Sequence, residues 1–380
     1  MKILQLHNFK RHGGGDEVVF TRTCQILRER GHEVIQVTRD SRLMEPTLAA
    51  KASALMESLH SRRAARQLEE LLAGESPAAA HVHNLFPFLS PSVMAACRRH
   101  GIPVYFHCHS YYLTCPIGYH FRKGGICQKC LRGNSLWCLL LNCRGNFAES
   151  VGIALQHAAS RKAGLGADLA DVYITPTNFA RKWLLDAGMP AEKVVYIANP
   201  IPLHDAVNDA GSGEYIAFAG RSSPEKGFAT LQAAVQKTGL PLHVAGAFPR
   251  GAHADGSIVY RGHLSGPDLD AFYQGARFLV VPSIWFETFA LVAGEAMSHG
   301  IPVIASRIGA LAEVVDDKHT GLLFGPGDAD DLADKMTWLW QRPDECRRMG
   351  AAGHWKVERE FAPGVYARNL LALYEKNRKK

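Results

Sequence analysis

A chain of 380 residues, 47% hydrophobic and 21% charged, is long enough for two globular domains of ordinary size. No uninterrupted apolar run approaches the roughly 20 residues that a bilayer-spanning helix needs, which excludes a membrane-embedded protein. The net charge is +7 and the pI about 8.9, but no helix-turn-helix, RNA-recognition or finger signature accompanies the basic residues. We therefore expect no nucleic-acid partner, and an anionic membrane surface or a pyrophosphate-bearing ligand explains the charge instead.

The first half of the chain alternates short β-like runs with helical ones. Residues 1–7 form a strand rather than a signal peptide, because the apolar run is too short, so we expect a cytoplasmic protein. A helix with an apolar stripe follows at residues 17–30 and ends at Gly31. Strands are predicted at residues 2–7, 33–38, 79–84, 104–109, 171–177 and 194–199.

Three consecutive glycines, Gly13, Gly14 and Gly15, separate the first strand from the first helix. Such a run lets backbone amides approach an anion or a sugar closely. It lacks the Gly-x-Gly-x-x-Gly pattern, and no ribose-binding acid follows the second strand, so it is not a dinucleotide fingerprint. A flexible loop is the alternative interpretation.

Residues 41–74 form a basic, amphipathic stretch in which arginines and lysines, among them Arg42, Lys51 and Arg66, alternate with leucines. Such a stretch can rest on an anionic membrane and meet a lipid-linked acceptor. A solvated helix pair packed on the first domain explains the pattern equally well.

Two His-x-His pairs, His81 with His83 and His107 with His109, occupy neighbouring predicted strands. Residues i and i+2 share one face of a strand, so a metal ion is one interpretation. We favour another, in which His83 and His109 end their strands at a ligand site while His81 and His107 are structural.

A cysteine-rich loop at residues 108–143 holds six of the nine cysteines. In a reducing compartment such a cluster indicates metal binding before disulfides. A structural zinc could be held by four thiolates, those of Cys115, Cys127, Cys130 and Cys143. Cys138 competes with Cys143 for the fourth place, and free buried cysteines or an oxidised Cys-x-x-Cys pair are the alternatives.

The second half repeats the alternation, with strands predicted at residues 214–220, 242–246, 258–262, 277–283, 302–306 and 321–324. Two such sets indicate an α/β protein of two Rossmann-like, doubly wound domains. Prolines at residues 199–202 mark the linker between an N-terminal domain, residues 1–199, and a C-terminal domain, residues 200–362. The last helix, residues 363–380, could pack back on the first domain. A ligand would lie at the carboxyl ends of the strands, in a cleft where the domains face each other.

A strand-to-helix turn in the second domain carries two cations. Gly220, Arg221 and Lys226 follow the strand at residues 214–220 and precede a helix. Cations fixed at such a turn suit a diphosphate, although surface Arg and Lys are common and either residue alone is weak evidence.

Two carboxylates, Glu287 and Glu295, bracket a run that follows the strand at residues 277–283 and opens a helix. On one helix an eight-residue step is about 12 Å of rise and roughly 80° of rotation, so the pair cannot readily share one metal ion. We expect the carboxylates to accept hydrogen bonds from two ends of a hydroxyl-rich ligand. Amides that open this helix could stabilise phosphates, namely those of Phe289, Ala290 and Leu291.

The Gly-rich first turn, the Arg221 and Lys226 pair and the Glu-x7-Glu run resemble the family-4 retaining glycosyltransferases of the two-domain GT-B fold. Residues 296–303, 309–315 and 321–324 are also similar to that family. The cysteine-rich loop resembles that of its polysaccharide-biosynthesis members. The resemblance covers the whole chain and is more specific in the second domain than in the first.

This resemblance implies a metal-independent retaining hexosyltransferase that moves a sugar from a UDP- or GDP-sugar to a glycan or lipid-linked acceptor. The expected role is surface polysaccharide or glycoconjugate biosynthesis, in the cytoplasm or peripherally on the inner face of the plasma membrane. The reaction would need no catalytic metal, and zinc would be structural.

The resemblance also implies roles by position. Glu287 would bind hydroxyls of the transferred sugar, and Glu295 the ribose. Catalytic roles fall on His109, Glu287, Arg221 and Lys226, the two cations neutralising the departing diphosphate. The implied donor-binding set is Gly14, Gly15, Gly220, Arg221, Lys226, Glu287, Thr288, Phe289, Ala290, Leu291 and Glu295.

Two positions depart from the family pattern. Ser110 stands where the family usually has Asp, which puts the orientation of His109 in doubt. Ala290 stands where Gly is frequent, and we expect that change to be sterically mild. Asp-x-Asp strings at residues 268–270 and 328–330 begin predicted helices, so N-capping and dipole complementarity explain them better than a metal.

Two rival functions are a nucleotide-sugar 2-epimerase of similar fold and a catalytically silent glycosyltransferase-like binding protein. The epimerases lack the Gly-Arg-x4-Lys and Glu-x7-Glu combination. The silent protein is supported only by the altered His109–Ser110 pair. No single motif encodes the donor base, sugar, acceptor or linkage.

Overall fold

The computed structural model describes residues 1–11, 13–204, 207–248 and 256–378. Contacts within the chain divide it into two compact units. The first unit comprises Met1–His120, Cys127–Ala198 and the chain from Ala367 on, and the second comprises Phe121–Ile126 and Asn199–Tyr366.

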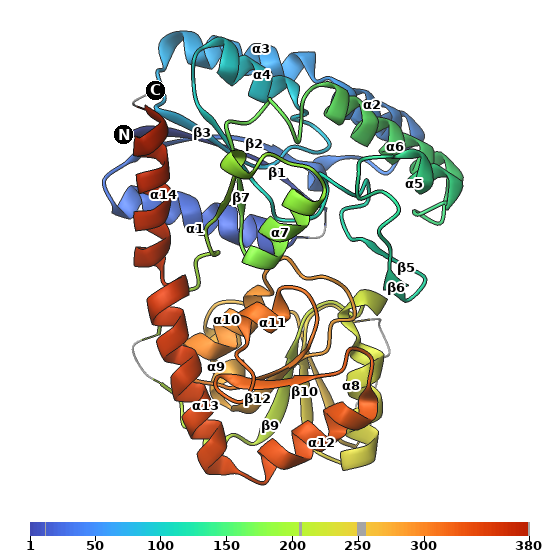
Figure 1. The fold of residues 1–380 in the computed structure, drawn as a ribbon, viewed down its shortest axis with the longest axis vertical. Coiled ribbons are helices and arrows are strands. Elements are labelled where there is room, and N and C mark those ends of the chain that lie inside the picture. The colour runs from blue at the N-terminus through green and yellow to red at the C-terminus, as the bar shows by residue number, and fades with distance from the viewer. Residues whose placement is uncertain (12, 205–206, 249–255, 379–380) are drawn as a thin grey trace. The chain divides into compact units, whose positions relative to one another are not determined.

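The first unit contains, in chain order, β1 (Lys2–Phe9), α1 (Gly15–Glu29), β2 (Glu33–Asp40), α2 (Leu48–Leu59), α3 (Arg62–Gly74), β3 (Ala79–Asn84), α4 (Ser92–Arg99), β4 (Val104–His107), α5 (Leu136–Leu140), α6 (Phe147–Lys162), β7 (Val172–Thr175), α7 (Asn178–Asp186) and β8 (Val194–Tyr196). Its sheet is parallel throughout, in the order β2-β1-β3-β4-β7-β8. Helix α1 lies on one side of the strands, and α3 and α4 lie on the other (Figure 1). Leucines and valines of the strands and of α3 and α4 fill the core.

The second unit contains β9 (Tyr215–Ala219), α8 (Phe228–Thr238), β10 (Leu242–Ala245), β11 (Ile258–Gly262), α9 (Pro267–Gln274), β12 (Ala276–Val281), α10 (Leu291–Ser298), β13 (Val303–Ser306), α11 (Leu311–Val314), β14 (Gly321–Phe324), α12 (Ala329–Trp340) and α13 (Pro343–Lys356). The sheet is again parallel, in the order β11-β10-β9-β12-β13-β14. In both sheets the strand order reverses beside the strand that comes first in the chain, β1 in the first sheet and β9 in the second, as in Rossmann-like folds. The predicted fold class of two such units is therefore confirmed.

Most predicted strands are found with their ends shifted by a few residues. Residues 104–109, for example, form only β4, because the chain leaves the sheet at Cys108. The short antiparallel pair β5 (Phe121–Arg122) and β6 (Gly125–Ile126) and the helices α5 and α6 were not predicted from sequence. Two-residue strands and a five-residue helix carry too little periodicity to be recognised from sequence. Helix α6 is long, but most of its buried residues are polar, namely Ser150, Gln156, His157 and Ser160, so it lacks an apolar stripe.

The last helix, α14 (Pro363–Arg378), ends in the first unit. Tyr374 is fully buried there, and its hydroxyl lies 2.6 Å from Nδ1 of His81 on β3. The ring of Tyr374 also packs edge-on against Tyr105 of β4, with centroids 4.7 Å apart. This polar and aromatic contact attaches the C-terminal segment to the first sheet.

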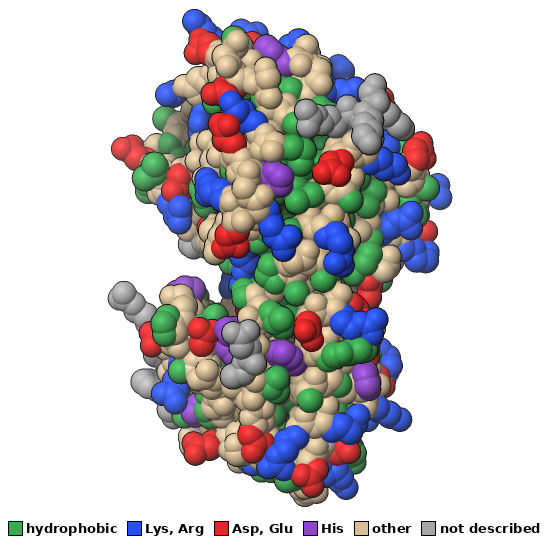
Figure 2. Space-filling view, turned by 90° about the vertical axis from the view of Figure 1, so that its left-hand side faces the viewer, with side chains coloured by type: hydrophobic (Ala, Val, Ile, Leu, Met, Phe, Trp, Pro, Cys, Tyr) green, Lys and Arg blue, Asp and Glu red, His purple; other side chains and the backbone are tan. Residues whose placement is uncertain are grey.

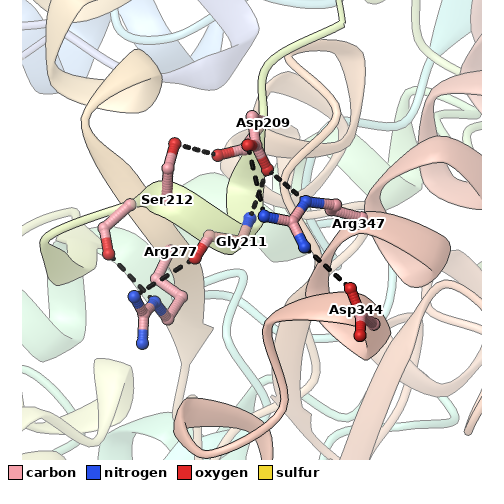
Figure 3. Close-up of polar contacts among 7 residues, drawn as sticks. Asp209, Gly211, Ser212, Arg277, Asp344 and Arg347 are labelled. Atoms are coloured by element: carbon pink, nitrogen blue, oxygen red, sulfur yellow. Dashed lines mark hydrogen bonds and ion pairs between the residues drawn. The ribbon is translucent and has the colours of Figure 1, made fainter.

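The turn that leads into β9 is held by two arginines (Figure 3). Arg277 donates to the carbonyl oxygens of Gly213, Gly211 and Trp340 at 2.9, 3.2 and 3.0 Å. Arg347 pairs with Asp209 and Asp344 at 2.7 and 2.8 Å. Because Arg277 satisfies backbone carbonyls and Arg347 is paired with two carboxylates, we interpret both as structural and not as ligand-binding cations.

Acidic and basic side chains are interspersed over both units on the face shown in Figure 2. On this face the excess positive charge is not gathered into one stripe. Across the described ranges, no helix combines the length and apolarity that crossing a membrane requires. The basic stretch at residues 41–74 forms the helix pair α2 and α3.

Candidate functional site

The turn after β9 is built so that Lys226 meets the segment after β12. Gly227 has φ +68°, and a Cβ there would lie 1.8 Å from the carbonyl oxygen of Pro282. The backbone N–H of Ile284 also donates to the Glu225 carbonyl at 2.9 Å. Only glycine allows this close approach of the two chain segments. The sequence run Gly220 to Gly227 is thereby fixed beside the run that carries Glu287.

Glu287 is buried and accepts three hydrogen bonds on one oxygen. Lys226 Nζ and Ser283 Oγ each lie 2.7 Å from Oε1, and Trp285 Nε1 lies 2.9 Å away. Burial alone would raise the pKa of this carboxyl, but the Lys226 ammonium and the three donors hold the pKa below its ordinary value. Glu287 is therefore ionised at neutral pH, and its orientation is fixed.

Lys226 remains partly accessible, with 23% of its side chain exposed against 7% for Glu287. Its ammonium also lies over the Trp285 ring, 5.5 Å from the centroid. The lysine can therefore reach an anion from solvent while it is held by the carboxylate. Removing one partner of such a buried pair typically costs about 3–5 kcal/mol, and the exposure of Lys226 favours the lower end.

Arg221 is the second cation of the turn. It is half exposed and lies 3.4 Å from Oε1 of Glu225, which also accepts a hydrogen bond from Ser223 at 2.7 Å. The contacts of Glu225, Ser283 and Trp285 were not predicted from sequence. Only their positions in the sequence could have indicated a role. Glu225 lies inside the Gly-Arg-x4-Lys run, and Ser283 and Trp285 lie four and two residues before Glu287.

The prediction that Glu287 and Glu295 share one helix is wrong. Helix α10 begins at Leu291, so Glu287 lies in the irregular segment before it. Glu295 is on the helix, and Oε2 accepts a long hydrogen bond from the Tyr273 hydroxyl at 3.4 Å. Phe289 contributes to packing, since its buried ring lies edge-on to Phe361 at 5.1 Å.

The expectation that Ala290 is sterically mild also needs correction. Ala290 is the N-cap of α10 and has φ +67° and ψ +74°, in the left-handed region. A residue with a Cβ pays roughly 1–2 kcal/mol for that conformation, which glycine adopts freely. The turn that orients Glu287 and opens α10 is therefore strained.

In the first unit, the glycine loop leads directly into α1, which begins at Gly15 rather than at residue 17. Gly14 is the N-cap, and a Cβ there would lie 2.7 Å from Oδ1 of Asp16. Lys10 Nζ pairs with the buried Asp16 carboxylate at 2.7 Å. Residue 12 lies outside the described residues.

Five histidines gather on the strands of the first sheet and just after them: His7, His81, His83, His107 and His109. The rings of the last four stack in a nearly parallel ladder, with centroids 4.4 Å apart for His81 and His83 and 4.2 Å apart for His107 and His109, and the His7 ring lies edge-on to His83. Burial, followed by the neighbouring histidines, lowers the pKa of His83 and His109 well below the ordinary value. These imidazoles are neutral at physiological pH.

His109 is held by a hydrogen bond to His83. His83 Nδ1 lies 2.9 Å from His109 Nε2, and His83 Nε2 lies 3.0 Å from Oε1 of Gln5. Because the Gln5 oxygen can only accept, His83 carries its proton on Nε2 and accepts at Nδ1. His109 then carries its proton on Nε2 and has its lone pair on Nδ1. The amide of Gln5 thus sets the tautomer of His109, a role that the sequence alone did not reveal.

The cysteine-rich loop brings several thiols near one another. Burial, and then the negative charge of Cys115, Cys143 and Cys127, raises the pKa of Cys130 to about 12. Burial and Cys143 likewise raise that of Cys138 to about 12. Because neighbouring thiols affect the pKa of Cys130 and Cys138, these cysteines belong to one cluster. Cys108 belongs to the hydrophobic core instead. In the described part of the chain, the groups that hold three candidate ligand atoms within 4.8 Å contain histidines and Asp270 and no cysteine.

The Asp-x-Asp strings lie where helices begin. The Asp328 side chain caps α12 by accepting from the N–H groups of Asp330 and Asp331, as expected. Asp268 and Asp270 lie in the first turn of α9, whose N-cap is Gly266, so dipole complementarity applies there but not capping.

Comparisons with known proteins agree with this architecture. Residues 13–205 match the family described as Glycosyltransferase Family 4, and residues 203–355 match the one described as Glycosyl transferases group 1. The MMP alpha-(1->4)-mannosyltransferase of Mycolicibacterium hassiacum is 39% identical over 114 residues, which cover 30% of this chain and 28% of that protein.

A Klebsiella pneumoniae protein, described as an uncharacterized 41.2 kDa protein in the cps region, is 27% identical over 203 residues. That match covers 48% of this chain and 56% of the relative, so the chain spans less than two thirds of either related protein. The solved structure of Anabaena HepE in complex with UDP-glucose has a TM-score of 0.67 at 16% identity, covering 99% of this chain and 100% of that one. At this identity the structural likeness shows the fold.

Proposed function

The chain belongs to glycosyltransferase family 4 and has the GT-B fold, and from this premise we propose that it is a metal-independent, retaining hexosyltransferase. The donor we propose is a nucleoside-diphosphate sugar. The observation that carries the proposal is the contact between Lys226 and the buried Glu287 carboxylate, beside Arg221. It places fixed positive charge next to an ionised acceptor of hydroxyl hydrogen bonds.

Lys226 and Arg221 would act on the diphosphate. Negative charge grows on this group as the glycosidic bond breaks, so cations held nearby stabilise the transition state more than the ground state. Lys226 is suited to this role because Glu287 positions its ammonium in advance and no rearrangement is needed when charge develops. Arg221, half exposed, can offer a bidentate contact to phosphate oxygens.

Glu287 would hold hydroxyls of the transferred sugar. Its carboxylate is kept ionised and is locked in place by Ser283 and Trp285, so an incoming hydroxyl meets an acceptor of fixed direction. Glu295, on the first turns of α10, would accept from ribose hydroxyls. Gly220 and residues 288–291 would line the donor with backbone atoms.

The first unit would supply His109 and the amides of Gly14 and Gly15. Our assignment of these roles follows the family resemblance. The neutral, tautomer-fixed His109 is suited to hydrogen bonding with an uncharged sugar, because a buried imidazolium would compete with the cations for the diphosphate.

The donor base is proposed to be uridine, with guanosine as the alternative. Support comes from Anabaena HepE, whose structure was solved in complex with UDP-glucose. Mannosyl transfer by the Mycolicibacterium hassiacum relative is consistent with a hexose. The Klebsiella relative from a cps region supports a place in surface polysaccharide biosynthesis.

A surface on α2, α5 and α6 supports a lipid-linked acceptor and an anionic membrane on the cytoplasmic face. Helix α6 packs against both α2 and α5, so the three present neighbouring surfaces. Large apolar side chains are exposed there, namely Leu48, Met56, Leu136, Leu140, Phe147 and Leu155. Lys51 and Arg144 lie among them, and exposed apolar groups beside cations suit a lipid headgroup region.

For the cysteine-rich loop we propose a structural zinc held by Cys115, Cys127, Cys130 and either Cys143 or Cys138. Thiolate ligands must lose their protons, and a pKa near 12 for Cys130 and Cys138 shows how strongly burial opposes this without a cation. A bound zinc would reverse that preference and close the loop.

The proposal is tested by thermal-shift and turnover measurements with a panel of UDP-, GDP- and ADP-sugars. A productive donor should raise the melting temperature and release its nucleotide only in the wild-type chain, not in Glu287→Gln. Absence of binding and turnover with every donor would exclude glycosyl transfer. Conversion of a donor to its epimer without an acceptor would identify the epimerase instead.

A further inference from the structure

His204, Asp270 and His299 form a group in the second unit that plays no part in the proposed transfer reaction. Asp270 lies in the first turn of α9, and His299 follows the last residue of α10. One candidate ligand atom from each of the three lies within 4.8 Å of the other two. The side chains come from three separate segments of the chain, so only folding brings them together.

Both imidazoles direct Nε2 toward the same carboxylate oxygen. Asp270 Oδ1 lies 3.3 Å from His299 Nε2 and 3.8 Å from His204 Nε2. The two rings stack with centroids 3.8 Å apart and planes 25° apart. These N···O distances exceed the usual 2.7–3.2 Å of a hydrogen bond. They lie near the roughly 3.3 Å that separates two ligands of a tetrahedral ion with bonds of about 2.0 Å.

Neighbouring residues hold His204 and His299 in fixed positions. His299 is buried, with 3% of its side chain exposed, and its ring is held between those of His204 and Tyr273. His354 Nε2 donates to the His204 carbonyl oxygen at 2.8 Å and so fixes the backbone that carries His204.

A comparison with the histidine ladder of the first unit favours this group as a metal site. His81, His83 and His107 also bring three nitrogens within 4.8 Å, but they are fully buried and offer no carboxylate. A buried dication among neutral ligands would keep its full charge in a medium of low dielectric constant. Asp270 supplies a negative charge, and its 44% exposure, with 35% for His204, leaves a side open to water.

We propose that His204, Asp270 and His299 bind a divalent transition-metal ion. Zinc matches two imidazoles and one carboxylate with a fourth position open to solvent. The site differs from the cysteine-rich loop in donor atoms and in its place in the fold.

The site has a direct connection to the proposed ribose-binding carboxylate. Tyr273 stacks on His299 with centroids 5.3 Å apart, and its hydroxyl donates to Glu295. If the proposed function holds, metal loading should change nucleotide affinity rather than the maximal rate. Metal binding itself does not depend on that function and can be measured without a donor.

The test uses the full chain, purified without a polyhistidine tag, stripped with a chelator and titrated with Co²⁺. Coordination by nitrogen and oxygen should give d–d absorption in addition to any thiolate charge-transfer band from the cysteine-rich loop, and this additional absorption is the signal to follow. We expect His204→Ala and Asp270→Asn to weaken this binding by at least about 10-fold. Both positions are partly exposed, so the variants should fold.

His263→Ala and Asp268→Asn are matched controls, because both residues are exposed neighbours outside the group, and they should bind Co²⁺ like the wild type. Equal binding by His204→Ala, Asp270→Asn and the wild type would overturn the proposal. So would a spectrum that contains only thiolate charge-transfer absorption, a loss confined to His81→Ala, or no binding at all.

Discussion

The two units present different chemistry at the carboxyl ends of their central strands. In the first unit, the stacked imidazoles of His83 and His109, at and beyond the ends of β3 and β4, are neutral, and His83 holds His109 in one tautomer. In the second, the segments after β9 and β12 carry the charged pair of Lys226 and Glu287. The same parallel-sheet architecture thus supports neutral hydrogen bonding in one unit and fixed charge in the other. The difference lies in side chains, not in topology.

The largest expected difference between the two units is the loss of folding stability in acid, which should be greater in the first unit. Burial lowers the pKa of His7, His120 and His157 in the first unit to about 4, against about 6.5 in an unfolded chain. Between these values the unfolded chain binds protons that the folded unit does not. Each histidine therefore removes up to about 1.4 kcal/mol of stability per pH unit as the pH falls from 6.5 towards 4.

The second unit should resist acid longer. Because the pKa of Glu287 is lowered, the stability it contributes is lost only below the ordinary pKa of a carboxyl. Above that, His243 and His299 are the histidines with a lowered pKa in the described part of this unit, fewer than in the first. Hydrogen exchange, pulsed at one fixed pH after incubation at pH 7.5, 6 and 5, should show β3 and β4 losing protection before β9 and β12. Earlier loss in β9 and β12 would contradict the comparison.

Breaking the charged pair should have the next largest effect. Glu287→Gln keeps an oxygen for Ser283 and Trp285 but removes the charge, and we expect kcat/KM to fall by about 100-fold or more. Lys226→Ala should lower kcat/KM by a similar factor. The double variant should lower it by much less than the product of the two single factors, because the two residues act together as one ion pair.

Exposed residues of the same types provide the controls for this cycle. Glu214→Gln and Lys237→Ala, the latter removing a surface pair with Asp330, should leave kcat/KM within about twofold. A fully multiplicative double variant would mean that the two residues act separately and would remove the main support for the proposed site.

Breaking the hydrogen bond between His83 and His109 in the first unit should have a smaller effect on the rate. His83→Leu removes the acceptor for His109, and we expect about a 10-fold fall in kcat with a shifted pH profile. His83→Asn should recover part of the rate, since its amide oxygen can replace Nδ1. Equal rates for His83→Leu and His83→Asn would indicate packing rather than positioning.

Ala290→Gly should give the smallest effect. Glycine relieves the left-handed strain at φ +67° but increases the entropy of the unfolded chain, so we expect a net gain of about 0.5 kcal/mol. The denaturant midpoint measures this change. Ala293→Gly, inside α10, should destabilise by about 1 kcal/mol or more and serves as the contrast; destabilisation by both variants would argue against strain at Ala290.

Much of this architecture was predictable because it depends on local sequence patterns. Alternating strands and helices indicated two doubly wound sheets, and the Gly-Arg-x4-Lys and Glu-x7-Glu runs indicated the two segments that meet in the second unit. The helix boundary at Leu291 was not predictable, since the left-handed Ala290 is a local violation of propensity imposed by packing.

The sequence by itself determined which cations, carboxylates and histidines follow each strand. Hydrophobic periodicity and turn residues are local features, so strands and the residues after them can be recognised without the fold. Only the tertiary structure decided which of them touch. Gly227 against Pro282 brings Lys226 to Glu287, Gln5 reaches His83 from another strand, and three distant segments bring His204, Asp270 and His299 together. Such contacts depend on packing between segments far apart in the chain, and no local pattern encodes those distances.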